Sequence, residues 1–107
     1  MPAERTQNLI LREFARSNPD SYSHFQQELE PIPLTRGGTL GTSRTQTDYV
    51  YFVESGVVSL VASTRNGHSL EVAIVGREGA AGIADALGRQ ALPYGWVVQI
   101  AGLAYRV

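Results

Sequence analysis

The spacing of apolar side chains changes along the chain, from a helical period near the N-terminus to alternation in the second half. Over residues 6–17, apolar side chains recur on one face and charged ones take the other, which predicts an amphipathic helix. Asn18 followed by Pro19 is a helix start signal, because asparagine can cap the first turn and proline lacks an N–H that would have no partner there. This pair predicts a second, shorter helix over residues 19–27.

After residue 30 the helical pattern ends. Pro31 and Pro33 cannot continue a helix, and they favour an extended or edge segment through Leu34. Gly37-Gly38 predicts a turn. Beyond it, short alternating runs rich in β-branched and aromatic residues are separated by glycines, which predicts an antiparallel sandwich, roll or barrel. The predicted strands cover residues 49–53, 57–63, 68–75, 94–101 and 103–107.

The dipeptide Asn66-Gly67 predicts a hairpin between the strands 57–63 and 68–75. A two-residue loop would pair Arg65 with His68 and would turn the better apolar faces of the two strands to opposite sides of the sheet. Because a one-residue slip moves a whole face, we predict a three-residue loop over 65–67, with Gly67 at positive φ in a bulge-type turn. This register pairs Leu60 with Val72, Val58 with Ile74 and Ala62 with Leu70.

The composition is that of one folded domain, with 107 residues, 43% of them hydrophobic and 18% charged. A net charge of −1 gives no basic footprint for nucleic acid. The absence of cysteine excludes disulfides, iron–sulfur clusters, zinc thiolate sites and cysteine nucleophiles. The N-terminus has no signal-peptide pattern, and no apolar run approaches the roughly 18 residues of a membrane span. We therefore expect a cytoplasmic protein with no membrane partner.

An ordered set of short motifs runs through the chain. It consists of Gly37-Gly38, Tyr51-Phe52, Gly56-Val57-Val58-Ser59-Leu60, Glu71-Val72, Val75-Gly76-Arg77-Glu78-Gly79 and Val98-Gln99-Ile100-Ala101-Gly102. With the preceding helix, this set resembles the effector domain of the Crp/Fnr family of bacterial transcription regulators, a relative of cyclic-nucleotide-binding domains. The resemblance covers about residues 8–107. It implies a mainly β fold with short flanking helices, an antiparallel double-stranded β-helix or jelly roll of eight strands.

The resemblance also implies a domain organisation. Residues 1–107 would form one effector, or sensor, domain that responds to an unknown small molecule or to none. In family members a dimerisation helix and then a helix-turn-helix domain follow this domain, and neither lies in this sequence. We therefore expect a fragment of a longer protein that forms a homodimer and contacts DNA only through the absent domain.

Cyclic-nucleotide binders of this superfamily hold the ribose with a glycine-glutamate pair and the cyclic phosphate with an arginine followed by a small hydroxyl residue. The resemblance places these positions at Gly82-Ile83 and near Tyr94-Gly95. Isoleucine cannot accept a hydrogen bond from the ribose, and tyrosine does not neutralise a phosphate as a guanidinium does. We expect a degenerate site and no cyclic nucleotide as cofactor; a functional nucleotide-binding module with substitute residues is the alternative.

The glycine-rich run from Gly76 remains the candidate ligand segment. Residues 77–88 predict one or two helical turns that end at Gly88. Backbone N–H groups at the start of such a helix can face an anion, but the glycines also suit a tight turn with close packing, the interpretation that we favour. The candidate ligand-binding residues are Arg77, Glu78, Gly79, Ala80, Ala81, Gly82 and Tyr94.

A small cupin-like enzyme is a third possibility, since cupins share a similar roll. Cupin enzymes bind metal through clustered histidines and a carboxylate, whereas His24 and His68 are far apart in this sequence and have no metal-ligand spacing. Ser59 and Ser63 lie on predicted strands without the sequence signature of a nearby base. We therefore predict no catalytic residue and no metal ligand, and expect that the chain is not an enzyme.

Overall fold

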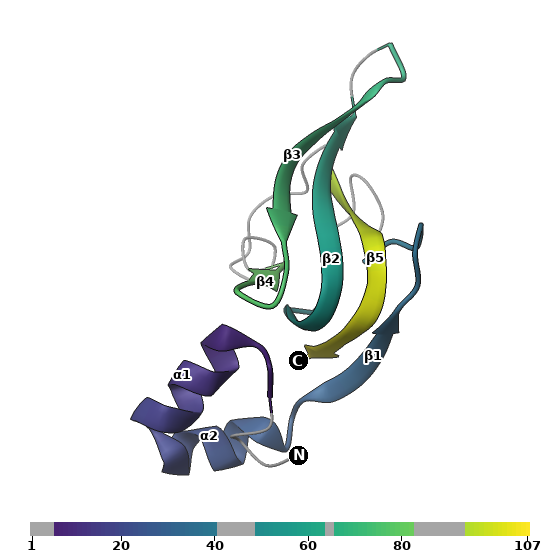
Figure 1. The fold of residues 1–107 in the computed structure, drawn as a ribbon. Helices are drawn as coiled ribbons and strands as arrows, with labels where there is room; N and C mark the ends of the chain where they lie inside the picture. The colour runs from purple at the N-terminus through teal and green to yellow at the C-terminus, as the bar shows by residue number, and fades with distance from the viewer. Residues whose placement is uncertain (1–5, 41–48, 64–65, 83–93) are drawn as a thin grey trace.

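The computed structural model describes residues 6–40, 49–63, 66–82 and 94–107. Two short helices precede an antiparallel sheet (Figure 1), as predicted. The elements are α1 (Leu9–Ser17), α2 (Pro19–Gln26), β1 (Glu30–Leu34), β2 (Tyr51–Ser63), β3 (Ser69–Val75), β4 (Ala80–Ala81) and β5 (Tyr94–Arg106). Neither helix is long and apolar enough to cross a membrane, a finding that covers the described residues alone.

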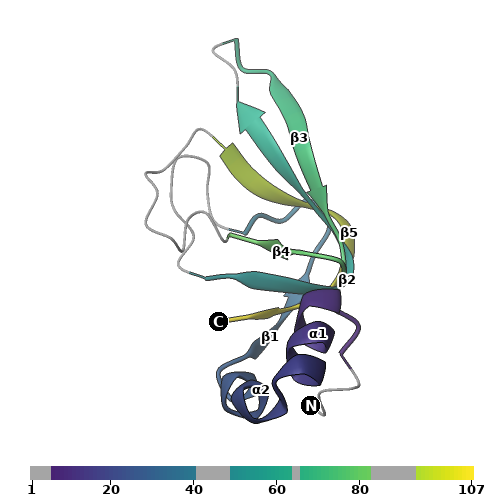
Figure 2. The same ribbon diagram turned by 90° about the vertical axis from the view of Figure 1, so that its left-hand side faces the viewer.

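The two longest strands, β2 and β5, form the centre of the sheet. The strand order is β1-β5-β2-β3, and β4 pairs with the beginning of β2. Figure 2 shows the helices at the end of the sheet where β2 begins and β5 ends, while the β2–β3 hairpin projects at the opposite end. We call these two regions the helix end and the hairpin end. β1 is an edge strand, which confirms the prediction from its two prolines.

The alternation of side chains along β2 divides the core into two clusters. Tyr51 and Val53 point to one side of the sheet, where they pack in the larger cluster. Phe52 points to the other side, where it packs with Leu11 of α1 and Tyr22 of α2 in a second cluster. Successive residues of a strand face opposite sides, so the helices cover the sheet face opposite the larger core. The three consecutive residues 51–53 of β2 therefore contribute to both buried faces of the sheet.

The helix starts follow the predicted signals in part. Pro19 occupies the first turn of α2 as expected, but the Asn18 side chain makes no cap hydrogen bond. A side-chain cap is found at the other helix, α1, where Asn8 accepts hydrogen bonds from the N–H groups of Ile10 and Leu11. The predicted start of this helix at residue 6 is therefore wrong, because Thr6 and Asn8 make other hydrogen bonds outside the helix. Local spacing did not show where these side chains would bond.

Two glycines predicted to separate strands lie inside them. The predicted strands 49–53 and 57–63 form the single strand β2, and 94–101 and 103–107 form the single strand β5. Register shifts between β2 and β5 surround Gly56, whose φ is 88°. A Cβ at Gly102 would stand 2.2 Å from the Ser55 carbonyl oxygen. Glycine permits a bulge and a close backbone approach as readily as a turn. The prediction that Gly56 and Gly102 separate strands is therefore wrong.

The hairpin register agrees with the prediction only near its turn. Ala62 pairs with Leu70 as predicted, and Gly67 has the predicted positive φ of 80°. A bulge then inserts Val72 as an extra residue, so that Leu60 pairs with Ala73. The predicted pairs Leu60–Val72 and Val58–Ile74 are therefore wrong; the observed partners of Val58 and Ile74 are Val75 and Ser59. The predicted loop includes Arg65, which lies outside the described residues.

The predicted turn at Gly37-Gly38 is confirmed. The Gly38 N–H donates to the Thr35 carbonyl at 2.8 Å, and Gly37 has a φ of 84°. The predicted helix over 77–88 is wrong for its first part, because Ala80 and Ala81 pair with β2 as β4. Backbone pairing with an existing strand here outweighs the helix propensity of alanine. The rest of that prediction, from residue 83 to Gly88, lies outside the described part of the chain.

Candidate functional site

The glycine-rich segment 76–82 leaves β3 as a tight turn and returns to the sheet as β4. The Gly79 N–H donates to the Gly76 carbonyl at 3.1 Å, which closes the turn. β4 follows at once and pairs with the first two residues of β2. Gly82 then adopts a φ of 90°, a conformation that favours glycine. The described part of the candidate ligand segment is thus a turn followed by a two-residue strand.

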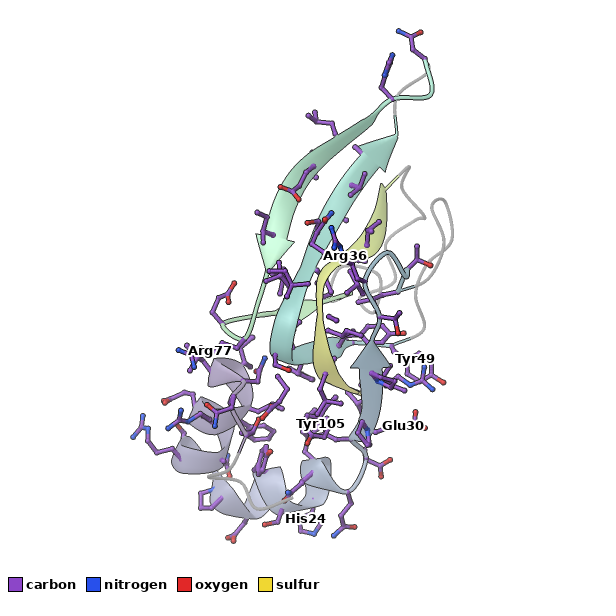
Figure 3. The ribbon with its side chains drawn as sticks, turned by 45° about the vertical axis from the view of Figure 1, so that its right-hand side comes forward. His24, Glu30, Arg36, Tyr49, Arg77 and Tyr105 are labelled. Carbon is purple, nitrogen blue, oxygen red and sulfur yellow. The ribbon has the colours of Figure 1, made fainter. Side chains whose placement is uncertain are left out.

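The two charged residues of this turn are exposed, and both take part in its local structure. The Glu78 carboxylate accepts a hydrogen bond from the Gly76 N–H at 2.9 Å. This bond is the main cause that lowers the pKa of Glu78, followed by the backbone N–H of Glu78 itself. The Arg77 carbonyl accepts a bond from the Leu9 N–H at 2.8 Å. Figure 3 shows Arg77 beside α1, across the sheet from Tyr49.

The remaining predicted site residues fall in different places. Ala81 is fully buried in the larger core, whereas Ala80 packs against the helix-facing cluster. The backbone of Tyr94 pairs with Ala62 near the hairpin end, while Ala81 pairs with Tyr51 at the start of β2. The structure therefore places Tyr94 at the other end of β2 from segment 76–82. Ile83, where the nucleotide binders have their glutamate, lies outside the described residues.

A buried polar network beside this turn was not predicted. Asn8 is fully buried, and its Nδ2 donates to the Val53 carbonyl at 2.7 Å and to the Gly79 carbonyl at 2.9 Å. Thr6, also fully buried, donates through Oγ1 to the Glu54 carboxylate at 2.7 Å. A local signal was present, since asparagine just before an apolar helix turn is a preferred cap. Its bonds to residues distant in sequence had no such signal.

Two tyrosines, Tyr22 and Tyr105, interact with the charge of Glu54. Burial raises the pKa of Tyr22, and the charges of Glu54 and Tyr105 add to that effect. Burial also raises the pKa of Tyr105, again with a contribution from Glu54. Both shifts have the expected sign, because burial and a nearby negative charge disfavour a phenolate. This part of the helix end therefore favours neutral phenols.

A group of contacts around Arg106 joins β1, β2 and β5 on the face of the larger core. Arg106 pairs across the sheet with Glu30 of β1 and with Tyr51 of β2. Its guanidinium donates to the Glu30 carboxylate at 2.6 Å and lies 4.1 Å from the centre of the Tyr49 ring. The Glu30 hydrogen bond is the main cause that raises the pKa of Arg106. Because Glu30 and Tyr49 already hold this cation, we assign it a structural role.

The two histidines weighed from the sequence lie in different elements. His24 lies on α2, and His68 lies beside the hairpin turn. No group of three histidine, cysteine, aspartate or glutamate residues suited to a metal ion occurs in the described ranges. Ser59 donates across the hairpin to Glu71, a carboxylate partner that the sequence did not reveal. Ser59 is fully buried, so a substrate cannot reach this hydroxyl in the observed conformation.

No family model and no curated protein matches the sequence. Solved structures do match its fold. The N-terminal domain of a transcriptional regulator from Streptomyces coelicolor has 18% identity and a TM-score of 0.74, over 98% of this chain and 71% of that chain. A cyclic nucleotide-binding-like protein from Brucella abortus has 21% identity and a TM-score of 0.70, over 89% of this chain and 81% of that chain.

A third similar structure is the sensor domain of a transcriptional regulator from Pseudomonas aeruginosa. It has 13% identity and a TM-score of 0.74, over 87% of this chain and 63% of that chain. These neighbours are named as regulatory or nucleotide-binding-like domains, and none of the three is named as an enzyme. The comparisons confirm the predicted class of fold: the chain has the antiparallel β-roll found in N-terminal domains of transcription regulators and in cyclic-nucleotide-binding domains.

Proposed function

We propose that this chain is the regulatory sensor domain of a Crp/Fnr-like bacterial transcription regulator, with a degenerate nucleotide site. The observation that carries the proposal is a fold match over 98% of the chain to the N-terminal domain of a transcriptional regulator. The match to a regulator's sensor domain supports the same assignment. In this proposal residues 1–107 form one effector domain, and DNA is contacted by a helix-turn-helix domain of a homodimeric full-length protein.

The degenerate site is supported by the residues of the glycine-rich segment. Glu78 closes its own turn, and the Arg77 carbonyl is bonded to α1. The sequence has isoleucine at 83 and tyrosine at 94, where a nucleotide-binding site needs an acid and an arginine. Without a charge-assisted pair, a cyclic phosphate loses its strongest hydrogen bonds. We therefore propose that the physiological effector, if the domain has one, is not cyclic AMP or cyclic GMP.

A second candidate is a functional cyclic-nucleotide-binding module that uses substitute residues. The similarity to the cyclic nucleotide-binding-like protein from Brucella abortus favours it. Titration of the purified chain with cyclic AMP and cyclic GMP separates the two candidates, because submicromolar binding would exclude a degenerate site. Metal analysis of the same sample addresses the cupin-like enzyme, which a stoichiometric transition metal would favour.

The regulator assignment is tested by the coding sequence that adjoins this domain. A following helix and helix-turn-helix domain would support it directly, because these two elements make the dimer and read DNA in such regulators. A stop codon after Val107, with no such domain in an interacting protein, would contradict it. This observation is independent of the ligand titration, so the two parts of the proposal stand or fall separately.

A further inference from the structure

The start of α1 is bonded to both sides of the helix end of the roll. The Asn8 side chain donates through Nδ2 to the Val53 and Gly79 carbonyls, and its Oδ1 accepts from the Ile10 and Leu11 N–H groups at 3.1 Å each. One fully buried side chain therefore caps the helix, holds strand β2 and holds the turn of segment 76–82.

Two further sets of bonds reinforce this junction. The Leu9 N–H donates to the Arg77 carbonyl, so two carbonyls of the turn accept bonds from the first residues of the helical layer. The Glu54 carboxylate accepts bonds from Thr6 Oγ1 and from the backbone N–H groups of Gln7 and Asn8. The tether Thr6–Leu9 is thus fixed to β2 on one side and to the glycine-rich turn on the other.

The two helices pack against each other through aromatic rings. The Phe14 ring meets Tyr22 edge-on at 5.4 Å and Phe25 at 5.4 Å, which locks α1 to α2. The turn's own hydrogen bonds are local, between Gly79 and Gly76 and between Glu78 and Gly76, and β4 directly after it pairs with the start of β2. A displacement of the turn must therefore either break the bonds that Asn8 and Leu9 donate to its carbonyls or shift the start of α1, which Val53 and Glu54 also hold to β2.

We propose that Asn8 is a positioning residue that couples the α1–α2 layer to the glycine-rich turn, so that a change in segment 76–82 is transmitted to the helices. Where that change is effector binding, the inference rests on the proposed function. The coupling itself is a property of the free chain, and it is reciprocal, because a coupling free energy acts equally in both directions. The helices are then the element that reports the state of the turn.

Amide hydrogen exchange on the complete chain without ligand tests this coupling. Asn8→Ser keeps a side-chain oxygen for the helix cap but removes the donor to Gly79 and Val53. We expect exchange of the 77–81 amides to accelerate about tenfold, the scale of a lost buried hydrogen bond. Asn18→Ser is the matched control, because Asn18 stands at the start of α2 without a side-chain cap bond. It should leave the turn unchanged.

The reverse direction uses Glu78→Ala, which removes the acceptor for the Gly76 N–H on the far side of the turn. We expect faster exchange of the Leu9 N–H, the donor to Arg77, by a severalfold factor. Two results would overturn the proposal. One is a uniform rise in exchange over the whole Asn8→Ser protein, which is the sign of global unfolding. The other is an effect of Glu78→Ala that is confined to the turn. Because no ligand is present, a negative titration with cyclic nucleotides would leave this result intact, and the two failures are distinguishable.

Discussion

The helix end and the hairpin end share strand β2, yet apolar side chains are buried at the first and exposed at the second. At the helix end, Phe52 is 9% exposed beneath α1 and α2, and Leu11 is fully buried. On β3 of the β2–β3 hairpin, Leu70 near the turn is 61% exposed and Ile74 farther along the strand is 60% exposed. The helix end is therefore expected to determine stability, while the hairpin end carries apolar surface that the described part of this chain does not cover. Large exposed apolar side chains in a group are typical of interaction surfaces.

The largest expected difference comes from truncating one leucine at each end. Leu11→Ala leaves a cavity in the helix-facing cluster and should lower the free energy of unfolding by about 2–5 kcal/mol. Leu70→Ala removes a side chain that is already mostly in water and should change it by no more than about 0.5 kcal/mol. Urea unfolding of both variants measures this contrast. Equal losses would mean that the hairpin end is packed in solution.

A matched pair of glycine substitutions tests the bend in the central strands. Gly102→Ala places a Cβ 2.2 Å from the Ser55 carbonyl oxygen, and such overpacking should cost about 2–3 kcal/mol. At Gly67 a Cβ meets no atom within 4 Å, so Gly67→Ala should cost only about 1 kcal/mol for its positive φ. Thermal unfolding compares them. A smaller cost at Gly102 would contradict the close approach of β2 and β5.

Tyr22→Phe is expected to be neutral or to raise the free energy of unfolding by up to about 1 kcal/mol. The Tyr22 hydroxyl is buried and has no hydrogen-bond partner among the residues that the structure describes. Its pKa is raised above 10.0 by burial. Folding therefore favours the neutral phenol. The folding stability that this preference contributes is complete below pH 10 and is lost as pH rises toward the raised pKa. Urea midpoints of both proteins in neutral and alkaline buffer measure this, and a clear loss in Tyr22→Phe at neutral pH would reveal a partner.

The smallest expected effect is an acid titration of the glycine-rich turn. The Gly76 hydrogen bond lowers the pKa of Glu78 below 4.5, so the bond is fully present above the ordinary pKa. It is lost as pH falls through the lowered value. The amide shift of Gly76, followed by nuclear magnetic resonance, should titrate with a midpoint below 4.5, and Glu78→Gln should abolish the titration. A midpoint at or above the ordinary pKa would contradict the observed bond.

Sequence reasoning was most reliable where the signal was local. The second helix after Pro19 and the edge strand with Pro31 and Pro33 are fixed by proline, which has few conformations. The turn at Gly37 uses a positive φ that glycine permits. It failed at Gly56 and Gly102, because a glycine serves a bulge as well as a turn. The predicted hairpin register is wrong at Val72 for another reason. We assumed that the apolar faces of the two strands must match, whereas the structure leaves Ile74 exposed.

The candidate site shows the same limit. The sequence identified segment 76–82 as a unit, but it did not show that Glu78 turns back on Gly76. The junction of Asn8 with Glu54 and Gly79 depends on contacts between residues distant along the chain, and periodicity carries no information on such contacts. Local patterns could therefore indicate Asn8 as a helix cap, but not its bonds to Glu54 and Gly79.

Our central proposal, a sensor domain whose nucleotide site lacks the charged pair, is tested most directly by calorimetric titration of the chain with cyclic AMP and cyclic GMP. Linear 5′-AMP serves as the control for non-specific binding of a phosphate. We predict no saturable heat for any of the three in the micromolar range. A submicromolar dissociation constant for either cyclic nucleotide, without binding of 5′-AMP, would contradict the claim and establish a functional nucleotide site.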